Sequence, residues 1–200
     1  MKRLVVATGN LDKLREIRML LGTAQIELTG LAECGDVQLP AEGSDYRTNA
    51  IAKARAVAQQ LGVASVADDS GLEVEALAGR PGPHSARYGG LGLDDTGRLG
   101  RLLSELSGVP VDRRAARFVC HAALVLPAGG LECVEGVCPG VICERPSGAG
   151  GFGYDPIFQP LGERCTMAEL SAARKNEISH RARAFAALSQ TASWASWLST

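Results

Sequence analysis

Residues 4–22 read LVVATGNLDKLREIRMLLG, and this stretch decides the fold class. The apolar run Leu4–Ala7 is typical of a short buried strand, and the turn residues 8–10 follow directly behind it. Apolar side chains then recur at helical spacing from Leu14 to Leu21, until Gly22 ends the pattern. A strand, a glycine-containing turn and a helix in this order are typical of the opening of an α/β fold.

Strand and helix patterns continue to alternate along the chain. Helices are predicted over 49–61 and 94–106, from the T-x-x-E capping pattern of Thr166 and Glu169, and behind Ser179. Strands are predicted over 65–67, 72–76, 117–126 and 131–142, and glycine-rich loops over 79–92 and 147–153. We therefore expect an α/β fold with a mixed β-sheet flanked by helices. Because no linker, repeat or low-complexity tract interrupts the pattern, we expect one domain over residues 1–200.

The composition is that of an ordinary soluble globular protein. Of the 200 residues, 46% are hydrophobic and 22% are charged, and the net charge is −1. Such a chain has no broad basic field to attract nucleic acid. No apolar run approaches the roughly 20 residues of a membrane span, and the N-terminal apolar stretch is too short for a signal peptide. We expect a cytoplasmic protein that binds neither nucleic acid nor membranes.

The six cysteines and three histidines do not form a metal-binding pattern. Without a C-x-x-C pair, a zinc site is not expected. Small buried thiols are favoured over disulfides, because cytoplasmic thiols stay reduced. His84 and His121 are interpreted as structural residues. Trp194 and Trp197 are interpreted as core residues, with a subunit contact as the alternative.

The turn Thr8–Lys13 is a candidate anion site. A helix N-terminus presents unpaired N–H groups and the positive end of the helix dipole, and Lys13 adds a full charge. The alternative is an ordinary turn in which Asn10 or Asp12 caps the helix. The turn does not match the pattern G-x-x-x-x-G-K-[ST], so it is not a P-loop.

Asp68-Asp69-Ser70-Gly71 is the most informative motif for chemistry. Adjacent carboxylates at a strand end repel each other unless a cation lies between them. Mg²⁺ fits this position, because it prefers hard oxygen ligands and the company of phosphates. The alternative is a turn in which the Asp and Ser side chains cap backbone N–H groups.

Two later segments offer groups for an organic ring. Residues 148–153 satisfy G-x-G-x-x-G, but no helix opens behind them and Pro156 follows, so a dinucleotide fold is rejected. Phe152 is interpreted either as a ring that stacks on a base or as a buried loop anchor. His180 and Arg181 place donors and cationic charge near the positive end of a helix dipole, which an electron-rich ligand would explain. The alternative is a solvated basic face.

Six motifs together resemble the inosine triphosphate pyrophosphatase family. They are TGNxxK at 8–13, NAxxKA at 49–54, DDSGL at 68–72, SARY at 85–88, GGFGYDPIF at 150–158 and ISHR at 178–181. They occur in the family's order and span most of the chain. The chain departs from the family where Pro40-Ala41-Glu42-Gly43 replaces a Glu-Glu-Thr-Gly-like segment, and where Thr48 replaces a Glu.

The resemblance implies a fold, an activity and partners. It implies an elongated mixed sheet with two lobes and a central nucleotide cleft, in a cytoplasmic homodimer that depends on Mg²⁺. The activity is then hydrolysis of the non-standard purine nucleoside triphosphates dITP, ITP and XTP to nucleoside monophosphate and pyrophosphate. Such an activity keeps deaminated purines out of DNA and RNA.

The resemblance also assigns site residues by position. It implies that the triphosphate is held by Thr8, Gly9, Asn10, Leu11, Asp12, Lys13 and Lys53. It makes Asp69 the proton acceptor and a metal ligand, with Ser70 touching the substrate and Glu42 as a metal ligand from a shifted position. Asp68 is a further candidate metal ligand from the adjacent carboxylates themselves. It implies that the base is surrounded by Phe152, Gly153, Tyr154, Asp155, Lys175, His180 and Arg181.

General chemistry gives these residues a mechanism. Water attacks the α-phosphorus in line, Mg²⁺ with Lys13 or Lys53 offsets charge on the leaving pyrophosphate, and Asp69 orients or deprotonates the water. Donors on His180 and Arg181 select a purine 6-oxo group over the amino group of adenine. Two other functions stay open. One is a related pyrophosphatase for modified pyrimidine or methylated nucleotides. The other is a regulatory nucleotide-binding module without catalysis, which Asp68 and Asp69 disfavour because extra negative charge does not help to bind an anion.

Overall fold

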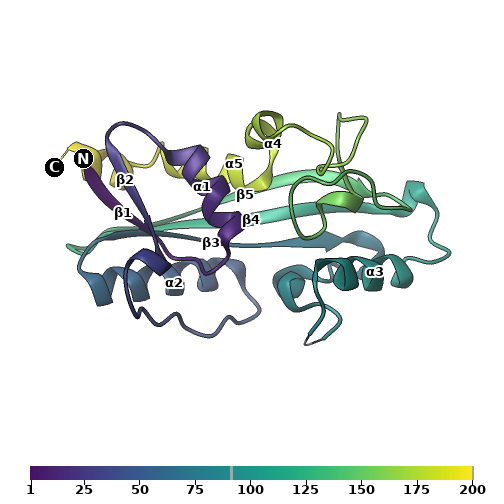
Figure 1. Cartoon of the computed structure of the whole chain (residues 1–200), viewed down its shortest axis with the longest axis horizontal. Coiled ribbons are helices and arrows are strands. Elements are labelled where there is room, and N and C mark those ends of the chain that lie inside the picture. Colours follow the sequence, from purple (N-terminus) through teal and green to yellow (C-terminus); the bar gives the residue numbers. More distant parts are fainter. Residues whose placement is uncertain (91, 200) are drawn as a thin grey trace. The chain divides into compact units, whose positions relative to one another are not determined.

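The structure is a computed structural model and describes residues 1–90 and 92–199. The described residues form one six-stranded sheet in the order β2-β1-β3-β4-β5-β6 (Figure 1). The strands are β1 (Lys2–Val6), β2 (Ile26–Gly30), β3 (Ala64–Val74), β4 (Ala115–Val125), β5 (Leu131–Ile142) and β6 (Phe158–Pro160). β1 runs parallel to β2 and β3, whereas β5 and β6 are antiparallel, which confirms the predicted α/β fold with a mixed sheet.

Helices flank the sheet, as predicted. Those in the described part of the chain are α1 (Leu11–Leu21), α2 (Tyr46–Leu61), α3 (Asp95–Glu105), α4 (Ala172–Ile178), α5 (His180–Leu188) and α6 (Ala192–Ser199). Each of the first three begins behind an Asn or Asp whose side chain accepts hydrogen bonds from first-turn N–H groups. α2 ends at Gly62, whose φ of +66° is the left-handed conformation that favours glycine at this position.

The chain divides into two compact units that each combine distant segments. Unit 1 is Met1–Asp69 with Cys120–Gly136 and Arg181–Thr200. Unit 2 is Ser70–Val119 with Val137–His180. The expectations of one domain over residues 1–200, of an elongated sheet and of a central cleft stay predictions.

In unit 1 the sheet is buried on both faces. Leu4, Val6 and Val66 belong to a cluster with α1, α5 and α6, whereas Val5 and Ala67 pack in a second cluster with α2. Figure 1 shows α2 on the opposite side of these strands from α1 and α5. Alternate residues of β1 and β3 therefore face opposite helices, as the period-2 geometry of a strand requires.

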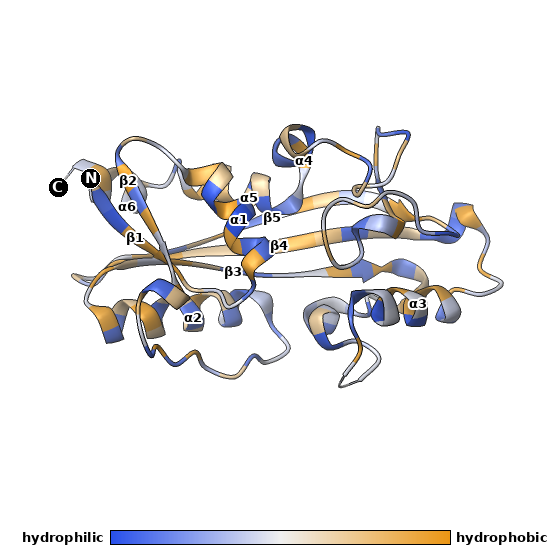
Figure 2. Ribbon diagram, viewed as in Figure 1, coloured by the Kyte–Doolittle hydropathy of each residue, from blue (hydrophilic) through white to orange (hydrophobic). Residues whose placement is uncertain are grey.

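Unit 2 has a separate apolar core. Leu72, Val74, Leu102, Phe118 and Phe158 contribute buried side chains from β3, α3, β4 and β6. In Figure 2 the apolar residues of these strands and of α3 alternate with hydrophilic ones. Tyr154 also belongs to this core, whereas the glycine-rich residues before it are held by polar contacts, which are described below.

Four expectations for local structure differ from the structure. The two short strands predicted around Asp68 are one continuous strand, β3. The N–H and the hydroxyl of Thr166 both donate to Glu169 Oε2, but these bonds close a turn, and the helix starts only at Ala172. The predicted last helix ends at Leu188 and a second helix, α6, follows. Only Cys120 and Cys138 are buried, whereas the other four free thiols are half-buried.

None of the described helices is both long enough and apolar enough to cross a bilayer. Trp194 is buried in the unit 1 core and Trp197 packs against that core, which agrees with the favoured interpretation of the two tryptophans.

Candidate active site

The turn between β1 and α1 is closed by its own side chains. Asn10 is the N-cap, and its Oδ1 accepts from the N–H groups of Asp12 at 2.9 Å and Lys13 at 3.0 Å. The Asn10 N–H in turn donates to Thr8 Oγ1 at 3.2 Å. Gly9 is exposed, and a Cβ at this position would meet nothing within 4 Å. The turn therefore presents an open backbone to solvent, and the charge it can offer an anion is that of Lys13.

Lys13 forms an ion pair with Asp68, which lies at the centre of a buried charge cluster. Lys13 Nζ is 3.2 Å from Asp68 Oδ2. The same oxygen accepts from Arg181 Nη2 at 2.8 Å and from Nε at 3.2 Å. Arg181 Nη1 donates to Glu16 Oε2 at 2.5 Å. Glu16, Asp68 and Arg181 are all less than 10% exposed and Lys13 is half-buried, so two acids and two bases meet with little access to water.

The cluster fixes the charge of Asp68. Burial alone raises the pKa of this carboxyl, but the positive charges of Arg181, Lys13 and Lys53 outweigh burial and hold the pKa far below its usual value. Burial lowers the pKa of Arg181, but the negative charges of Asp68 and Glu16 outweigh burial, so the pKa is raised. Asp68 is therefore an anion at every physiological pH.

Asp69 lies in a different environment, although it is the next residue. Its Oδ2 accepts from Asn49 Nδ2 at 2.8 Å, and its Oδ1 lies 3.3 Å from Lys53 Nζ. Lys53 Nζ also donates to Glu42 Oε1 at 2.6 Å. Asn49 also connects Gly43, the residue after Glu42, to Asp69. Its side chain accepts from the N–H of Gly43 and donates to the carbonyl of Gly43.

The environment of Asp69 shifts its pKa upward. Burial is the main cause, and it outweighs the opposing effects of the Lys53 charge and the Asn49 hydrogen bond. The pKa of Lys53 is also raised, because the charges of Asp69 and Asp68 together with Glu42 outweigh its burial. A carboxyl whose pKa is raised accepts a proton more readily than an ordinary carboxylate, which suits it to the role of a general base.

The predicted cation between Asp68 and Asp69 is not supported by this geometry. Successive residues of β3 face opposite sides of the sheet, so Asp68 points to α1 and α5 while Asp69 points to α2. Each carboxylate has its own basic partners, and the two do not converge on one position. Asp68 as a metal ligand therefore has no support here.

Asp69 and Glu42 do fit a magnesium ion chemically. Both carboxylates lie within 3.3 Å of one cation, the Lys53 ammonium, and they come from separate segments. Mg²⁺ is commonly held by one or two carboxylates together with phosphate oxygens. Within the described residues no three His, Cys, Asp or Glu side chains gather in a set that could hold a metal without such additional ligands.

In unit 2 the glycine-rich loop is anchored around Phe152. Asp155 is buried, and its Oδ2 accepts from the Phe152 N–H at 2.9 Å and from Lys175 Nζ at 2.5 Å. Lys175 Nζ also lies 4.9 Å from the centre of the Phe152 ring. Gly151 passes so close that a Cβ would be 2.0 Å from Asp155 Oδ2, which explains why glycine is required there. The structure thus brings together Phe152, Asp155 and Lys175, three residues that the resemblance assigns to the base.

The other predicted site residues of unit 2 have contacts outside the group of Phe152, Asp155 and Lys175. The His180 ring stacks on Phe118 with centroids 4.7 Å apart. Tyr154 is buried and its hydroxyl donates to the Ser85 carbonyl at 3.0 Å. Ser70 is half-buried in β3, and the Gly153 N–H donates to Asp95 Oδ2 at 2.7 Å. Tyr154 is therefore a packing residue of this unit.

Sequence reasoning missed three polar residues. Glu16 supplies a buried charge, Asn49 orients Asp69, and Asp95 holds the loop at Gly153. Asn49 belongs to a quoted motif and could have been assigned from it. Glu16 is one of several charged residues on α1, and Asp95 lies in an ordinary first turn, so neither carries a sequence signal.

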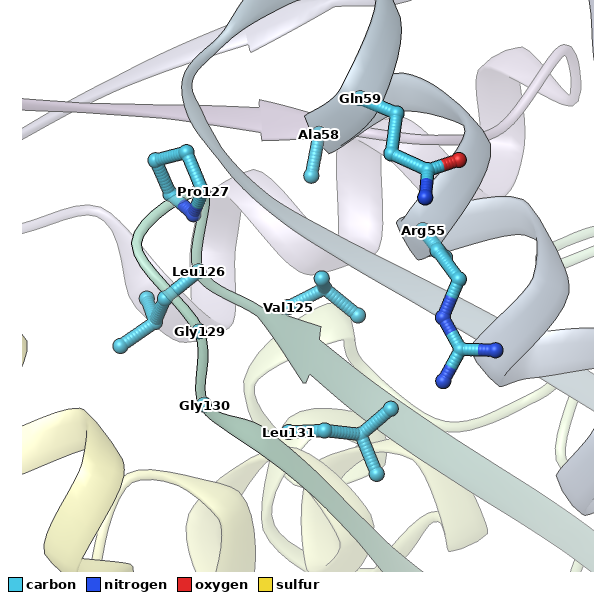
Figure 3. Close-up of a pocket in the computed structure, with 9 residues that line it drawn as sticks. All are labelled: Arg55, Ala58, Gln59, Val125, Leu126, Pro127, Gly129, Gly130 and Leu131. Atoms are coloured by element: carbon cyan, nitrogen blue, oxygen red, sulfur yellow. The ribbon is translucent and has the colours of Figure 1, made fainter.

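A hollow of about 260 Å³ in unit 1 lies away from these residues (Figure 3). In Figure 3, Arg55 and Gln59 project from α2 beside the turn between β4 and β5. The lining residues are Arg55, Ala58, Gln59, Val125, Leu126, Pro127, Gly129, Gly130 and Leu131. None of them is a predicted site residue, so the hollow is not the candidate active site.

The fold and the charged centre together define an α/β protein with a buried carboxyl, a nearby second acid and two lysines, a set suited to chemistry on phosphate groups. A sequence profile of the Ham1 family matches residues 4–191. The chain belongs to the Ham1 family.

Relatives match almost the whole chain. A dITP/XTP pyrophosphatase of Geobacillus kaustophilus is 46% identical over 191 residues, which cover 95% of this chain and 94% of that protein. One from Mycobacterium tuberculosis is 47% identical over 190 residues, 93% of each chain. The structure of a HAM1 protein from Coxiella burnetii superimposes with a TM-score of 0.84 at 39% identity, covering 94% of this chain and 97% of the other.

Proposed function

We propose that this chain is an enzyme that hydrolyses the non-standard purine nucleoside triphosphates dITP, ITP and XTP to nucleoside monophosphate and pyrophosphate. The observation that carries the proposal is the arrangement of Asp69, a buried carboxyl held by Asn49 and placed beside Lys53 and Glu42. The names of the relatives, dITP/XTP pyrophosphatase, support the same substrate class.

In unit 1 the residues of the turn and the two lysines are proposed to bind the triphosphate. Lys13 and Lys53 are cations whose carboxylate partners, Asp68 and Asp69, lie on opposite faces of β3. Anionic phosphate oxygens would be attracted to both ammonium groups. Asp69 would accept a proton from the attacking water, and its raised pKa favours that role.

A magnesium ion is proposed as the cofactor, held by Asp69 and Glu42. When bound, such an ion offsets charge on phosphate oxygens and on the leaving pyrophosphate. Lys53, which lies between the same two carboxylates, would then turn its ammonium toward the phosphates.

In unit 2 the proposed contacts with the base come from Phe152, Lys175 and His180. The Phe152 ring would stack on the purine, and His180 and Lys175 would offer donors to an oxo group. Adenine carries an amino donor at the 6-position, which would leave a protein donor facing a donor. The resemblance also assigns Arg181 to the base, although its guanidinium already donates hydrogen bonds to Asp68 and Glu16. The cationic start of α5 is thus compensated within the protein and does not itself require a ligand.

A homodimer and a cytoplasmic location belong to the same proposal. Both follow from the resemblance of the motifs to their family. The near-equal charge sum, 21 basic against 22 acidic residues, is consistent with a nucleotide rather than a nucleic acid as the partner.

The proposal is tested by measuring pyrophosphate release from ITP, dITP, XTP, ATP and GTP with purified protein and Mg²⁺. We expect kcat/KM for ITP to exceed that for ATP by at least about tenfold, the factor that one mismatched buried donor supplies. Release of orthophosphate alone, or equal rates on ITP and ATP, would contradict the proposal. Methylated and modified pyrimidine nucleotides in the same panel test the related activity.

A further inference from the structure

We propose that Asp95, the first residue of α3, is a positioning residue for the Phe152 loop and thereby for the base. The inference rests on the proposed function, because it assigns the loop to base binding. Asp95 comes from a segment that carries none of the six motifs, and it reaches the loop from 58 residues away in sequence.

The loop needs anchors because of its composition. Residues 148–153 contain four glycines, which have more backbone freedom to lose on ordering than any other residue. Gly151 and Gly153 also adopt positive φ values of 69° and 62°. A single aromatic ring carried by such a segment has a defined position only if the backbone on both sides is tied down.

The two N–H groups at the ring are tied to two different carboxylates. The Phe152 N–H donates to Asp155 and the next N–H, that of Gly153, donates to Asp95 Oδ2 at 2.7 Å. A third anchor is the Gly150 N–H, which donates to the carbonyl of Ala168. Asp155 fixes the backbone at Phe152, and Asp95 fixes it at the next residue, Gly153.

Asp95 divides its two oxygens between two tasks. Oδ1 pairs with Arg98 Nη2 at 2.8 Å on the same helix, and Oδ2 is left for the loop. Burial raises the pKa of this carboxyl, but hydrogen bonds from Arg98 and Gly153 outweigh it, so the acceptor is charged at neutral pH. The side chain is 49% exposed, whereas Asp155 is buried. Asp95 can therefore be replaced without opening the core.

The neighbouring residue provides a matched control. Asp94 is the N-cap of α3, and its Oδ1 accepts from the Gly97 N–H at 2.8 Å. Asp94→Ala removes one carboxylate from the same helix end and weakens the helix, but it leaves the Gly153 hydrogen bond in place. Asp95→Asn keeps a carbonyl oxygen that accepts from Gly153, and Asp95→Ala removes it.

The test combines steady-state hydrolysis of ITP with amide hydrogen exchange of residues 148–155 in the full-length protein. For Asp95→Ala we expect KM to rise about fivefold to tenfold with kcat within about twofold, as expected when a hydrogen bond that holds a binding group is lost. Exchange at Gly153 should accelerate at least about tenfold. Asp95→Asn should restore KM to within about twofold of wild type, and Asp94→Ala should change neither KM nor the exchange of the loop.

Each result decides whether Asp95 positions the Phe152 loop. If wild type hydrolyses ITP and Asp95→Ala has an unchanged KM, or if the exchange of Gly153 is unaffected, Asp95 does not position the loop and only this inference fails. If Asp94→Ala raises KM as much as Asp95→Ala, the effect belongs to the helix end and the inference also fails. Wild-type protein that does not hydrolyse ITP overturns the proposed function and this inference with it.

Discussion

At the scale of single residues, Asp68 and Asp69 show how one step along a strand changes the chemistry of a carboxyl. Both are buried, and burial raises the pKa of each. Asp68 meets a lysine and an arginine directly, so its pKa falls, whereas Asp69 meets one lysine and an amide, so its pKa stays raised. The first is a permanent anion that holds cations in place, and the second can exchange a proton.

Asp69→Asn tests this division of roles. The amide occupies the same volume and its oxygen still accepts from Asn49 or Lys53, but it cannot accept a proton from water. We expect kcat for ITP to fall at least about a hundredfold, because general-base catalysis contributes that much or more. Thermal unfolding should shift little. A variant that retains more than a tenth of the wild-type kcat would show that Asp69 is not the proton acceptor.

At the scale of elements, the contact between α1 and α5 is ionic rather than apolar at one point. Arg181 stands in the first turn of α5, where a cation is unfavourable for the helix dipole. Glu16 of α1 and Asp68 of β3 compensate it, and all three side chains are buried. The three elements are therefore held together by charges that have no access to water.

Arg181→Leu should destabilise the protein strongly, since it leaves two buried carboxylates without their main partner. Removal of one member of a buried ion pair costs about 3–5 kcal/mol. Glu16→Gln leaves Arg181 paired with Asp68, so its cost should be smaller, about 1–2 kcal/mol. Urea unfolding followed by tryptophan fluorescence measures both. Equal effects of the two substitutions would contradict the central place of Arg181 in the cluster.

The same elements show what could be predicted from sequence. The β1–α1 opening, α2, α3, β4 and β5 follow from period-3.6 or period-2 patterns with glycine and Asp or Asn at their ends. The continuity of β3 could not be predicted, because Asp68-Asp69-Ser70 has the composition of a turn. Its acids are tolerated inside a strand only because cations reach them from elsewhere, Arg181 from 113 residues away. Local patterns carry no information about such partners.

The candidate site was predictable to a similar degree. The resemblance assigns Lys53 and Asp69 to the triphosphate and its hydrolysis, and Phe152 and Lys175 to the base. In the structure Lys53 Nζ lies 3.3 Å from Asp69 Oδ1, and Lys175 Nζ lies 4.9 Å from the centre of the Phe152 ring. The geometry does not support the expected cation between Asp68 and Asp69. The motif was interpreted as two acids at a strand end, whereas both residues lie inside β3, where successive side chains face opposite sides of the sheet.

At the scale of the whole molecule, the stability of the fold depends on pH. A carboxyl whose pKa is lowered in the folded state stabilises the fold above its ordinary pKa of about 3.9, and this contribution is lost as the pH falls. Asp68 is such a group, and so are Asp45, Asp95, Glu105 and Glu169. Asp69, with a raised pKa, acts in the opposite direction, but it is one group against several.

We therefore expect the unfolding free energy to be nearly constant from pH 6 to 8 and to fall below pH 4, by about 2 kcal/mol or more at pH 3. Both tryptophans of the chain, Trp194 and Trp197, lie in α6 of unit 1, so their fluorescence reports on the unit that contains Asp68. Circular dichroism of the whole chain serves as the comparison. Equal stability of unit 1 at pH 3 and pH 7 would contradict this prediction.

The order in which the chain is made has a consequence for unit 1, which takes its last segment from residues 181–200. During translation Asp68 leaves the ribosome 113 residues ahead of Arg181. At about 5–20 residues per second, Arg181 is synthesised about 6 to 23 seconds after Asp68. During this time the first strands and helices lack the Arg181 guanidinium, which pairs with Asp68 and Glu16 in the folded unit. A message that stops before codon 181 therefore yields a nascent chain whose unit 1 stays unfinished, however much of its sheet has already been synthesised.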